Sequence, residues 1–465
     1  MAQLFISAAH KSSGKTTVTL GLCRALRNRG LRVQAFKKGP DYIDPIWHGL
    51  ASGQPSYNLD FHLMGEVEIL PLFARHAARA DLALVEGNKG LYDGMDVAGS
   101  NSNAALAKLL GVPVVLVLDS VGVTRGVAPL ILGYQAFDRE VNIAGVILNK
   151  VGGPRHEEKL RAVIERYTDV KVLGAVRMQE DLSIVERHLG LIPGNEADAA
   201  DRRIEAIARA VSDQVDLDAL LEVAGKAALP KVDADVSAVV LEPAGDTLTL
   251  AYAHDRAFGF YYQEDLDTLR DQGVVLRRLD TLNDARLPEC DGLILGGGFP
   301  EVFIEQLEAN ASLRADIRRA IDAGLPVHAE CGGLMYLSRT LRWGARQGEM
   351  VGVVPGDVVM GSRPVGRGYA TLEETGRGLG SAGSPPLPAH EFHYSHLENL
   401  PPDLHYAYRV LRGHGIDGSQ DGFVHKNLLA AYCHRRGSGP SGWIAPFLRR
   451  VGTFAANRKA ARLAA

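Results

Sequence analysis

The ten residues Ala8–Thr17, which read Ala-Ala-His-Lys-Ser-Ser-Gly-Lys-Thr-Thr, constrain the fold more than any other part of the chain. The apolar run Leu4–Ile6 precedes them, and the run Val18–Leu26 after them has apolar residues at helical spacing. A strand, a tight loop and a helix form the context that a phosphate-binding loop requires. A Ser-rich helix N-cap is the alternative reading, and Ala9 stands where the usual pattern has its first glycine.

In a phosphate-binding loop, backbone N–H groups and the helix N-terminus hold phosphate oxygens. Lys15 would then reach the terminal phosphates, and the hydroxyl of Thr16 would ligate Mg²⁺. We expect Gly14 and Thr17 to belong to the same nucleotide site. The loop therefore predicts a domain that binds a nucleoside triphosphate together with Mg²⁺.

Size and composition narrow the class of protein. A chain of 465 residues is too long for one ordinary core, so two or three domains are expected. The formal net charge of -4 argues against nucleic acid as a partner. The 4 cysteines lack C-x-x-C spacing and suggest neither a zinc site nor a disulfide framework. The first residues lack the basic region of a signal peptide, and no uncharged stretch reaches transmembrane length. We therefore expect a cytoplasmic protein without a membrane partner. We also expect a monomer or a homodimer.

A second strand, Leu31–Phe36, runs into a stretch with two carboxylates, Asp41 and Asp44, between Pro40 and Pro45. Carboxylates at the C-terminal end of a strand suit a metal or substrate site in an open α/β sheet. A turn in which aspartate accepts local hydrogen bonds explains the same pattern. These residues alone leave the two readings open.

A third strand, Leu82–Val85, ends in Glu86, which is a natural second anchor for Mg²⁺ beside a P-loop. Further apolar strands are expected at residues 112–118, 143–149 and 172–176, with helical stretches between them. Strands that alternate with helices predict a parallel, doubly wound sheet.

From about Ser212 to Asp246 the alternation of apolar strands and helices is no longer clear, and we expect a linker there. This divides the chain into a P-loop domain of residues 1–235 and a second α/β domain of residues 246–450. In the second domain, strands are expected at 248–253, 274–277, 292–295 and 326–329, and a helix at 263–272. The Gly- and Pro-rich remainder is expected to form antiparallel strands and loops.

The last of these strands leads into Glu330-Cys331-Gly332-Gly333 and a helical run. A cysteine at a sharp strand-to-helix turn is the arrangement of a nucleophile, because the turn exposes the sulfur. The N–H groups of Gly297 and Gly298 could form an oxyanion hole. His434 is the best candidate for the base, although it is one of 15 histidines. A buried structural cysteine is the alternative reading of Cys331.

Together these stretches resemble the glutamine-dependent cobyrinic acid a,c-diamide synthase family, over nearly the whole chain. The sister family that makes cobyric acid carries Lys-Pro-Gln-Asn-Met where this chain has Lys-Gly-Pro-Asp-Tyr, and is disfavoured. The matching motifs are Ser-Gly-Lys-Thr-Thr at 13–17, Gly-Pro-Asp-Tyr-Ile-Asp-Pro at 39–45, Asn-Leu-Asp at 58–60, Glu-Gly at 86–87, Gly-Leu-Tyr-Asp-Gly at 90–94, Gly-Val-Ile-Leu-Asn at 145–149, Arg-His-Leu-Gly-Leu at 187–191, Ala-Phe-Gly-Phe-Tyr-Tyr at 257–262, Gly-Gly-Gly-Phe-Pro-Glu at 296–301, Ala-Glu-Cys-Gly-Gly-Leu-Met-Tyr-Leu at 329–337 and His-Glu-Phe-His-Tyr-Ser at 390–395.

The resemblance implies an ATP-dependent amidoligase domain fused to a class I glutamine amidotransferase domain. It implies that the a and c acetate carboxylates of a corrinoid are activated as acyl phosphates and amidated with ammonia from glutamine. The roles carried over by position are ATP and Mg²⁺ binding by Lys15 and Thr16, metal and phosphoryl handling by Asp41, Asp44 and Glu86, contact with the tetrapyrrole carboxylate by Tyr42, Ile43 and Asp93, and glutamine hydrolysis by Cys331 and His434.

Departures from the family pattern keep alternatives open. Arg436 stands where other class I glutaminases have an acidic residue, so a dyad without an orienting carboxylate is expected. Lys38 replaces a usual valine, and Ala-His-Lys-Ser-Ser replaces the commoner loop sequence. Relatives that amidate sirohydrochlorin or sirohaem are therefore an alternative. A non-catalytic P-loop switch is another, although His10 stands where such switches carry their signature lysine.

Overall fold

The structure is a computed structural model, and it describes residues 2–179, 186–187, 190–191, 200–230 and 247–464. The chain forms two compact units, Met1–Val236 and Ser237–Ala465. The predicted domain boundary at residues 235–246 and part of the motif at 187–191 lie outside the described residues. Among the helices that are described, none is long and apolar enough to cross a bilayer.

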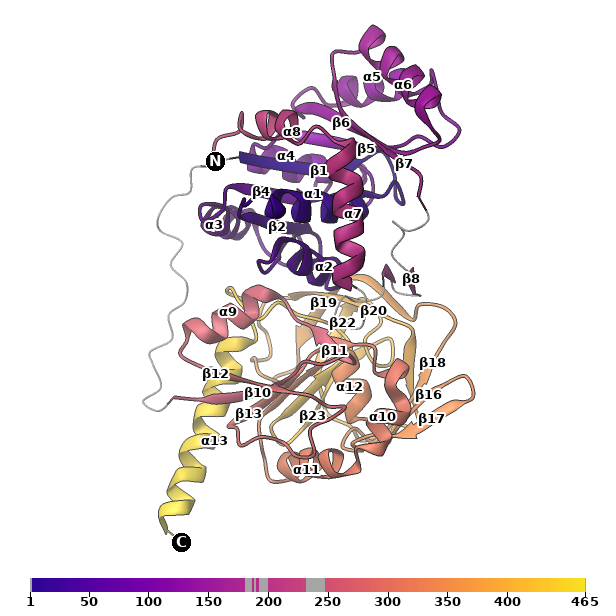
Figure 1. Cartoon of the computed structure of the whole chain (residues 1–465). Helices are drawn as coiled ribbons and strands as arrows, with labels where there is room; N and C mark the ends of the chain where they lie inside the picture. The colour runs from indigo at the N-terminus through magenta and orange to yellow at the C-terminus, as the bar shows by residue number, and fades with distance from the viewer. Residues whose placement is uncertain (1, 180–185, 188–189, 192–199, 231–246, 465) are drawn as a thin grey trace. The chain divides into compact units, whose positions relative to one another are not determined.

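The first unit is built on a sheet of seven parallel strands in the order β3-β2-β4-β1-β5-β6-β7 (Figure 1). The prediction of a parallel α/β sheet is confirmed. Because β1 is the central strand, the loop after it lies in the middle of the sheet's C-terminal edge, where open α/β sheets bind ligands. The strands are β1 (Ala2–Ala8), β2 (Val33–Lys38), β3 (Tyr57–Leu59), β4 (Leu82–Glu86), β5 (Val114–Asp119), β6 (Ile143–Val151) and β7 (Lys171–Arg177).

Helices cover both faces of this sheet. On one face α1 (Lys15–Asn28) packs against α2 (Ile43–Ser52) and α7 (Ala200–Gln214), and Figure 1 shows α1 and α7 side by side. Alternate residues of β4 and β5 point to the other face, where they share a core with four helices. Those helices are α3 (Glu66–Ala77), α4 (Asn103–Leu110), α5 (Val127–Phe137) and α6 (Pro154–Tyr167).

The linker prediction is wrong for its first half. Helix α7 continues to Gln214, and a further helix, α8, spans Leu217–Ala224. The carboxylate of Asp216 caps α8 by accepting the N–H of Ala219 at 2.8 Å. The helix forms because Leu217, Leu220 and Val223 recur at helical spacing and are buried, a pattern that the sequence analysis passed over. The last part of the predicted linker, residues 231–246, lies outside the described residues.

The second unit is built on a nine-stranded mixed sheet in the order β12-β10-β13-β15-β24-β23-β22-β19-β20. The first five strands run parallel, and the remaining pairs are antiparallel. The strands are β10 (Thr249–Ala253), β12 (Val275–Leu279), β13 (Gly292–Leu295), β15 (Val327–Glu330), β19 (Gly366–Glu374), β20 (Leu387–His393), β22 (Tyr406–Arg412), β23 (Gln420–His425) and β24 (Leu428–Ala431).

Two helical layers and two small sheets complete this unit. Helices α10 (Ile304–Ala309), α11 (Ala311–Asp322) and α12 (Gly332–Leu337) share one core with the sheet. Helices α9 (Gln263–Asp271) and α13 (Ile444–Ala464) contribute to a second core, around Ile294 and Leu250. The small sheets are β11 (Phe258–Phe260) with β14 (Gly297–Gly298), and β16 (Thr340–Trp343), β17 (Arg346–Glu349), β18 (Asp357–Met360) and β21 (Ser395–Glu398).

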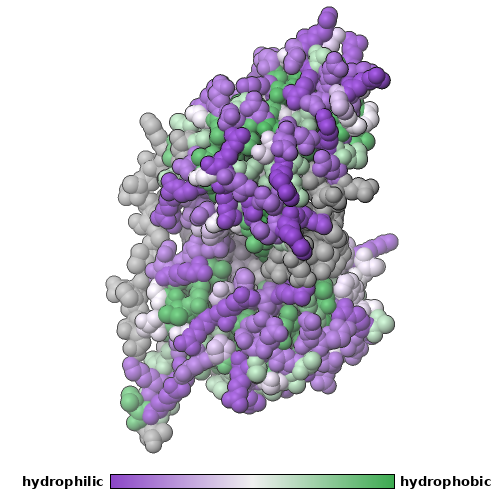
Figure 2. Space-filling model, in the orientation of Figure 1, coloured by the Kyte–Doolittle hydropathy of each residue, from purple (hydrophilic) through white to green (hydrophobic). Residues whose placement is uncertain are grey.

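The prediction of antiparallel strands and loops after residue 337 holds for most of this region and fails in three places. Strand β24 runs parallel to β15, and β18 runs parallel to β16. The third exception is the 21-residue helix α13, which continues past residue 450. Hydrophilic residues cover most of the face drawn in Figure 2, with apolar residues in small groups between them.

Candidate active sites

The P-loop of the first unit lies between the end of β1 and the first residue of α1, Lys15. Gly14 has φ +86°, and a Cβ there would lie 2.1 Å from Nδ2 of Asn149. Ser12 also has a positive φ, of 66°. The loop needs glycine at position 14 because the left-handed backbone and the close approach of Asn149 both exclude a side chain.

Side chains at the ends of β5 and β6 hold the P-loop in place. The amide of Asn149 donates to the carbonyl of Ser13 at 2.9 Å. The ammonium of Lys150 donates to the carbonyl of Ser12 at 2.9 Å and to the carboxylate of Asp119 at 2.7 Å. Asn149, Lys150 and Asp119 were not predicted as site residues. Their position after two apolar strands of the same sheet is the signal that could have indicated them.

Lys15 is buried beneath the loop with 8% of its surface exposed. Burial lowers the pKa of Lys15 to about 8, and the carboxylate of Glu86 opposes this shift. Thr17, in the same first turn of α1, is partly buried. A buried ammonium at a helix N-terminus gains an ion-pair partner when a phosphate binds, so this arrangement suits the triphosphate of a nucleotide.

Thr16, Asp44 and Glu86, which are far apart in the sequence, meet in one charged network. The Thr16 hydroxyl donates to Oε1 of Glu86 at 2.6 Å and to Oδ2 of Asp44 at 3.4 Å. The ammonium of Lys37 lies between the two carboxylates, 2.5 Å from Asp44 and 2.8 Å from Glu86. His48 Nε2 lies 2.6 Å from the other oxygen of Glu86. Lys37 and His48 were missed by the sequence analysis.

The carboxylate of Glu86 has no exposed surface. Burial favours its neutral form, but Lys37 and His48 outweigh burial and hold the pKa of Glu86 well below its usual range. The two carboxylates likewise raise the pKa of Lys37 against the effect of its burial. Glu86 and Lys37 are therefore charged at neutral pH. The carboxylate oxygens of Glu86 and Asp44 form a concentrated set of hard oxygen atoms beside Thr16.

Asp41 takes part in the local turn that the sequence left open as one of two interpretations. Its Oδ1 accepts the N–H groups of Ile43 at 2.9 Å and of Asp44 at 3.0 Å, as in a turn that begins a helix. Burial, and then the neighbouring charge of Asp44, raise the pKa of Asp41 to about 6. The carboxylate of Asp41 therefore stays mostly ionised at neutral pH and takes up a proton more readily than an ordinary aspartate.

The three predicted substrate-binding residues differ in exposure. Tyr42 and Ile43 are buried, with 8% and 9% of their surface exposed. Asp93 is exposed; its Oδ2 accepts the N–H of Gly90 at 2.9 Å and interacts electrostatically with Lys15. Of the three, Asp93 is therefore the one whose side chain is open to solvent.

Cys331 in the second unit lies at the turn between β15 and α12, with φ +47° and ψ −100°. This backbone conformation is strained for a residue with a side chain, as expected for a nucleophile elbow. The N–H of Cys331 donates to the carbonyl of Ala431 at 2.7 Å, which ties the turn to β24. The predicted elbow therefore has a structural basis in the pairing of these two strands.

His434 lies beside Cys331 because it follows β24, which runs parallel to β15. Glu330 at the end of β15 pairs with Ala431 at the end of β24. Beyond β24, the N–H and carbonyl of His434 pair with the carbonyl and N–H of His390, at 2.8 and 3.0 Å. The ring of His434 is hydrogen-bonded to the thiol of Cys331. The structure thus brings the predicted nucleophile and base together.

The glycines of β14 lie against the same pair. A Cβ on Gly297 would lie 2.8 Å from Cε1 of His434. A Cβ on Gly332, the residue after the cysteine, would lie 2.9 Å from the backbone nitrogen of Gly298. The backbone of the predicted oxyanion hole therefore borders the nucleophile, with no side chain between them.

The expectation of a dyad without a carboxylate is wrong. Oε2 of Glu330 lies 3.1 Å from Nδ1 of His434. Burial favours the neutral ring, but the hydrogen bonds to Cys331 and Glu330 outweigh it and raise the pKa of His434 to about 10. Arg436 points elsewhere and pairs with Glu264 at 2.5 Å.

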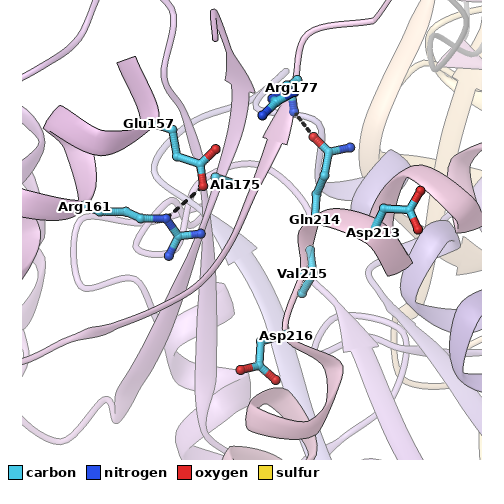
Figure 3. Close-up of a pocket in the computed structure, with 8 residues that line it drawn as sticks. All are labelled: Glu157, Arg161, Ala175, Arg177, Asp213, Gln214, Val215 and Asp216. Carbon is cyan, nitrogen blue, oxygen red and sulfur yellow. Dashed lines mark hydrogen bonds and ion pairs between the residues drawn. The ribbon is translucent and has the colours of Figure 1, made fainter. Parts of the chain in front are cut away.

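A further pocket of about 390 Å³ lies at the edge strand β7 of the first unit (Figure 3). None of the predicted site residues lines it. Some of the polar groups that line the pocket bond to one another: the guanidinium of Arg161 donates to the carboxylate of Glu157 at 2.9 Å, and the backbone N–H of Arg177 donates to the amide oxygen of Gln214 at 2.9 Å. The lining residues are Glu157, Arg161, Ala175, Arg177, Asp213, Gln214, Val215 and Asp216.

The two units define a class of protein: a P-loop nucleotide-binding domain joined to an α/β domain with the cysteine–histidine site of a glutamine amidotransferase. Comparison with protein families agrees. Residues 5–192 match the CobQ/CobB/MinD/ParA nucleotide binding domain, and residues 249–438 match the CobB/CobQ-like glutamine amidotransferase domain.

Whole-chain relatives identify the family. The cobyrinate a,c-diamide synthase of Magnetococcus marinus is 44% identical over 455 residues, which cover 96% of each chain. That of Methanosarcina acetivorans is 38% identical over 98% of this chain and 96% of its own, and that of Caldanaerobacter subterraneus is 40% identical over 93% and 95%. The chain belongs to the cobyrinate a,c-diamide synthase family, and it is a glutamine-dependent amidotransferase.

Proposed function

We propose that the protein amidates the a and c acetate carboxylates of a cobyrinate-type tetrapyrrole, with ATP to activate each carboxylate and glutamine as the source of ammonia. The observation that carries the proposal is the presence of both halves of this chemistry in one chain. A buried lysine and carboxylate network lies under a P-loop in one unit, and a hydrogen-bonded Cys331–His434 pair lies in the other.

In the glutaminase half, Sγ of Cys331 attacks the side-chain carbonyl of glutamine, and the N–H groups of Gly297 and Gly298 stabilise the oxyanion. His434 holds the proton of the thiol and delivers it to the departing nitrogen, which leaves as ammonia. Water then hydrolyses the glutamyl thioester and regenerates the cysteine. The balance is glutamine plus water to glutamate plus ammonia.

In the ligase half, an acetate oxygen of the tetrapyrrole attacks the γ-phosphorus of ATP and displaces ADP. Ammonia attacks the resulting acyl phosphate, phosphate leaves, and the amide remains. Lys15 neutralises charge on the transferred phosphoryl group, since its buried ammonium faces the loop that holds the phosphates. Activation is required because a carboxylate and ammonia do not condense unaided in water.

The residues around Thr16 fit Mg²⁺. Mg²⁺ in nucleotide sites takes one or two protein oxygens together with phosphates and waters, and it needs no cage of protein ligands. Among the described residues, no group of three His, Cys, Asp or Glu side chains could hold a metal ion by itself. Thr16 with Glu86, Asp44 or Asp41 would hold the ion, which would neutralise phosphate charge. Lys37 already occupies the space between two of these carboxylates and would share them with the ion.

We assign substrate binding to the C-terminal end of β2 and to the loop of Asp93. Asp41 and Asp44 would face phosphate and metal, and Asp93 would lie near the tetrapyrrole carboxylate, with Lys15 as the cation that attracts the acetate group. Tyr42 and Ile43 would pack the edge of the macrocycle, which requires the start of α2 to open, because both are buried. We further propose that the protein works in the cytoplasm, as a monomer or homodimer.

The sirohydrochlorin alternative makes a different prediction. The experiment incubates the protein with ATP, glutamine and one of three tetrapyrroles: cobyrinate, sirohydrochlorin or sirohaem. Mass spectrometry of the products then distinguishes a cobyrinate-type substrate from a sirohydrochlorin-type substrate. We expect a diamide from cobyrinate and at most slow conversion of the others. Faster amidation of sirohydrochlorin or sirohaem would overturn the substrate assignment, and ATP hydrolysis without any amide would favour a switch.

A further inference from the structure

Glu330 is a buried carboxylate that the sequence analysis assigned no role, one residue before the nucleophile. We infer that Glu330 is the third member of the glutaminase site, a positioning residue that orients the ring of His434 toward Cys331. The inference rests on the proposed glutaminase chemistry. It concerns how the base is held, and not whether Cys331 is the nucleophile.

Both oxygens of Glu330 are committed to neighbours. Oε2 lies 3.1 Å from Nδ1 of His434. Oε1 accepts the backbone N–H of Arg435 at 3.1 Å and lies 3.1 Å from Nε2 of His328. The side chain is 11% exposed, so few waters compete for these bonds. A carboxylate held at both oxygens cannot rotate away from the histidine, which makes it a fixed acceptor.

The contact between Glu330 and His434 determines which ring nitrogen of His434 carries a hydrogen toward the carboxylate. A carboxylate accepts hydrogen bonds, so Nδ1 of His434 carries a hydrogen toward Glu330. Nε2 is then the ring nitrogen left to exchange a proton with the thiol of Cys331, to which the ring is hydrogen-bonded. Nδ1–H bonded to a carboxylate and Nε2 facing the nucleophile is the arrangement that cysteine and serine triads share.

His328 holds the carboxylate from the other side. Its ring stacks on Trp443, with centroids 3.9 Å apart and planes 14° from parallel. Nδ1 of His328 is buried without a hydrogen-bond partner among the described residues. A buried N–H without an acceptor is costly, so the hydrogen of the neutral ring belongs on Nε2, from which it is donated to Glu330. Glu330 is thus held between His328, which donates a hydrogen bond to Oε1, and His434, whose ring Glu330 orients through Oε2.

The strand register explains why this carboxylate can replace the missing acidic residue. Glu330 and Ala431 are paired in parallel strands, so the residues after Ala431 pass beside the end of β15. The position two residues after His434 is Arg436, whose guanidinium is bound to Glu264. The orienting charge therefore comes from the strand of the nucleophile and not from the strand of the histidine.

The other titratable groups around His434 do not supply this contact. The His390 ring stacks on it at 5.0 Å and is itself bonded to the hydroxyl of Tyr262 at 3.1 Å. Arg435 points to the hydroxyl of Tyr408 at 2.8 Å. After burial, which favours the neutral ring, the hydrogen bonds to Cys331 and Glu330 set the pKa of His434 at about 10. Removing the charge of Glu330 should therefore lower that pKa and make the ring lose its proton at lower pH.

The test compares Glu330→Gln with Asp265→Asn in the full-length protein, by the pH dependence of glutamate release. Asp265 is the control because it is also a buried acidic side chain beside this segment, but it accepts backbone N–H groups, that of Gly437 at 2.9 Å and that of Ser438 at 3.1 Å. We expect Glu330→Gln to lower kcat by roughly 10²–10⁴-fold with little change in KM, and to move the basic limb of the profile to lower pH. Asp265→Asn should leave the basic limb in place.

Two measurements keep the inference testable if Glu330→Gln folds poorly, which circular dichroism would reveal. His328→Gln keeps the contact to His434 and should lower kcat by less than Glu330→Gln. In the unsubstituted protein, a proton NMR signal far downfield should report the Nδ1–H of His434 and disappear in His434→Gln. A Glu330→Gln variant with the normal kcat and basic limb, or a control that shifts as much, would overturn the positioning role while leaving the glutaminase assignment of Cys331 intact.

Discussion

Replacing Glu86 by glutamine should both destabilise the first unit and weaken its dependence on Mg²⁺. Glu86 is fully buried and binds three donors, the Thr16 hydroxyl, the Lys37 ammonium and the His48 ring, at 2.6, 2.8 and 2.6 Å. Glutamine keeps one acceptor but removes the charge. Lys37 then retains one carboxylate instead of two, so its buried ammonium loses part of the charge stabilisation that offsets its burial.

The contacts of Lys37 with Glu86 and Asp44 determine how much stability the Glu86→Gln substitution removes. Removing one partner of a buried ion pair outright costs about 3–5 kcal/mol. Asp44 remains 2.5 Å from Lys37 in the variant, so we expect a loss of about 2–3 kcal/mol. For a domain of this size that corresponds to a Tm lower by about 4–12 °C. The loss of one charged oxygen ligand should also raise the Mg²⁺ concentration needed for half-maximal activity by on the order of tenfold.

The stability that Glu86 contributes should decrease as the pH falls. The pKa of Glu86 is depressed in the folded protein, so its contribution to stability is present above the pKa of an unfolded glutamate, about 4.3, and is lost as pH falls toward the folded value. The difference in Tm between the original protein and Glu86→Gln should therefore shrink on acidification below pH 4.

The assay is thermal unfolding followed by a Mg²⁺ titration of ammonia-dependent amidation. Glu140→Gln is the matched control, since Glu140 also binds a lysine, at 3.2 Å, but its side chain is 80% exposed. Its effect on stability should stay below about 0.5 kcal/mol. An unchanged Tm and an unchanged Mg²⁺ titration in Glu86→Gln would show that Glu86 neither stabilises the first unit nor binds Mg²⁺.

Three further predictions concern the other residues. Cys331→Ala should abolish glutamate release but leave amidation with added ammonium salts; glutamate release at the normal rate, measured by a coupled assay, would contradict the assignment. Lys15→Ala should remove amidation with either nitrogen source, and calorimetry should show ATP affinity of the original protein falling as pH rises above about 8, because the free enzyme then loses the Lys15 proton. ATP affinity independent of pH between 7 and 9 would argue against this role. Tyr42→Ala should change the ratio of mono- to diamide, seen by mass spectrometry over time, more than ATP affinity; the reverse pattern would place Tyr42 in the nucleotide pocket.

The parts of the fold that depend on local pattern were predictable from the sequence. The runs Leu82–Val85 and Ile143–Leu148 contain no charged or polar side chain, which is typical of strands in a buried parallel sheet. The P-loop was recognisable because its glycine, lysine and threonine have a fixed spacing that phosphate binding requires. Helix α13 was missed because Gly452 and several basic residues interrupt its apolar pattern.

The contacts within each site depend on strand pairing, which local pattern does not show. Glu330 and His434 are more than a hundred residues apart and meet because β15 pairs with β24 in one register. Lys37 faces Asp44 and Glu86 because β2 pairs with β4, with Lys37 opposite Glu86. Sequence alone could place a carboxylate before the cysteine and a lysine before the aspartates, but not say which side chains they bind.

The central claim is that nitrogen from glutamine reaches the acetate carboxylates of a corrinoid in an ATP-dependent reaction. The most direct test supplies cobyrinate, ATP and glutamine labelled with ¹⁵N in its amide, with unlabelled ammonium in the buffer, and weighs the product. We expect a diamide that carries ¹⁵N at both new amides and forms only with ATP. A product without ¹⁵N, or glutamate release and ATP hydrolysis without any new amide, would contradict it.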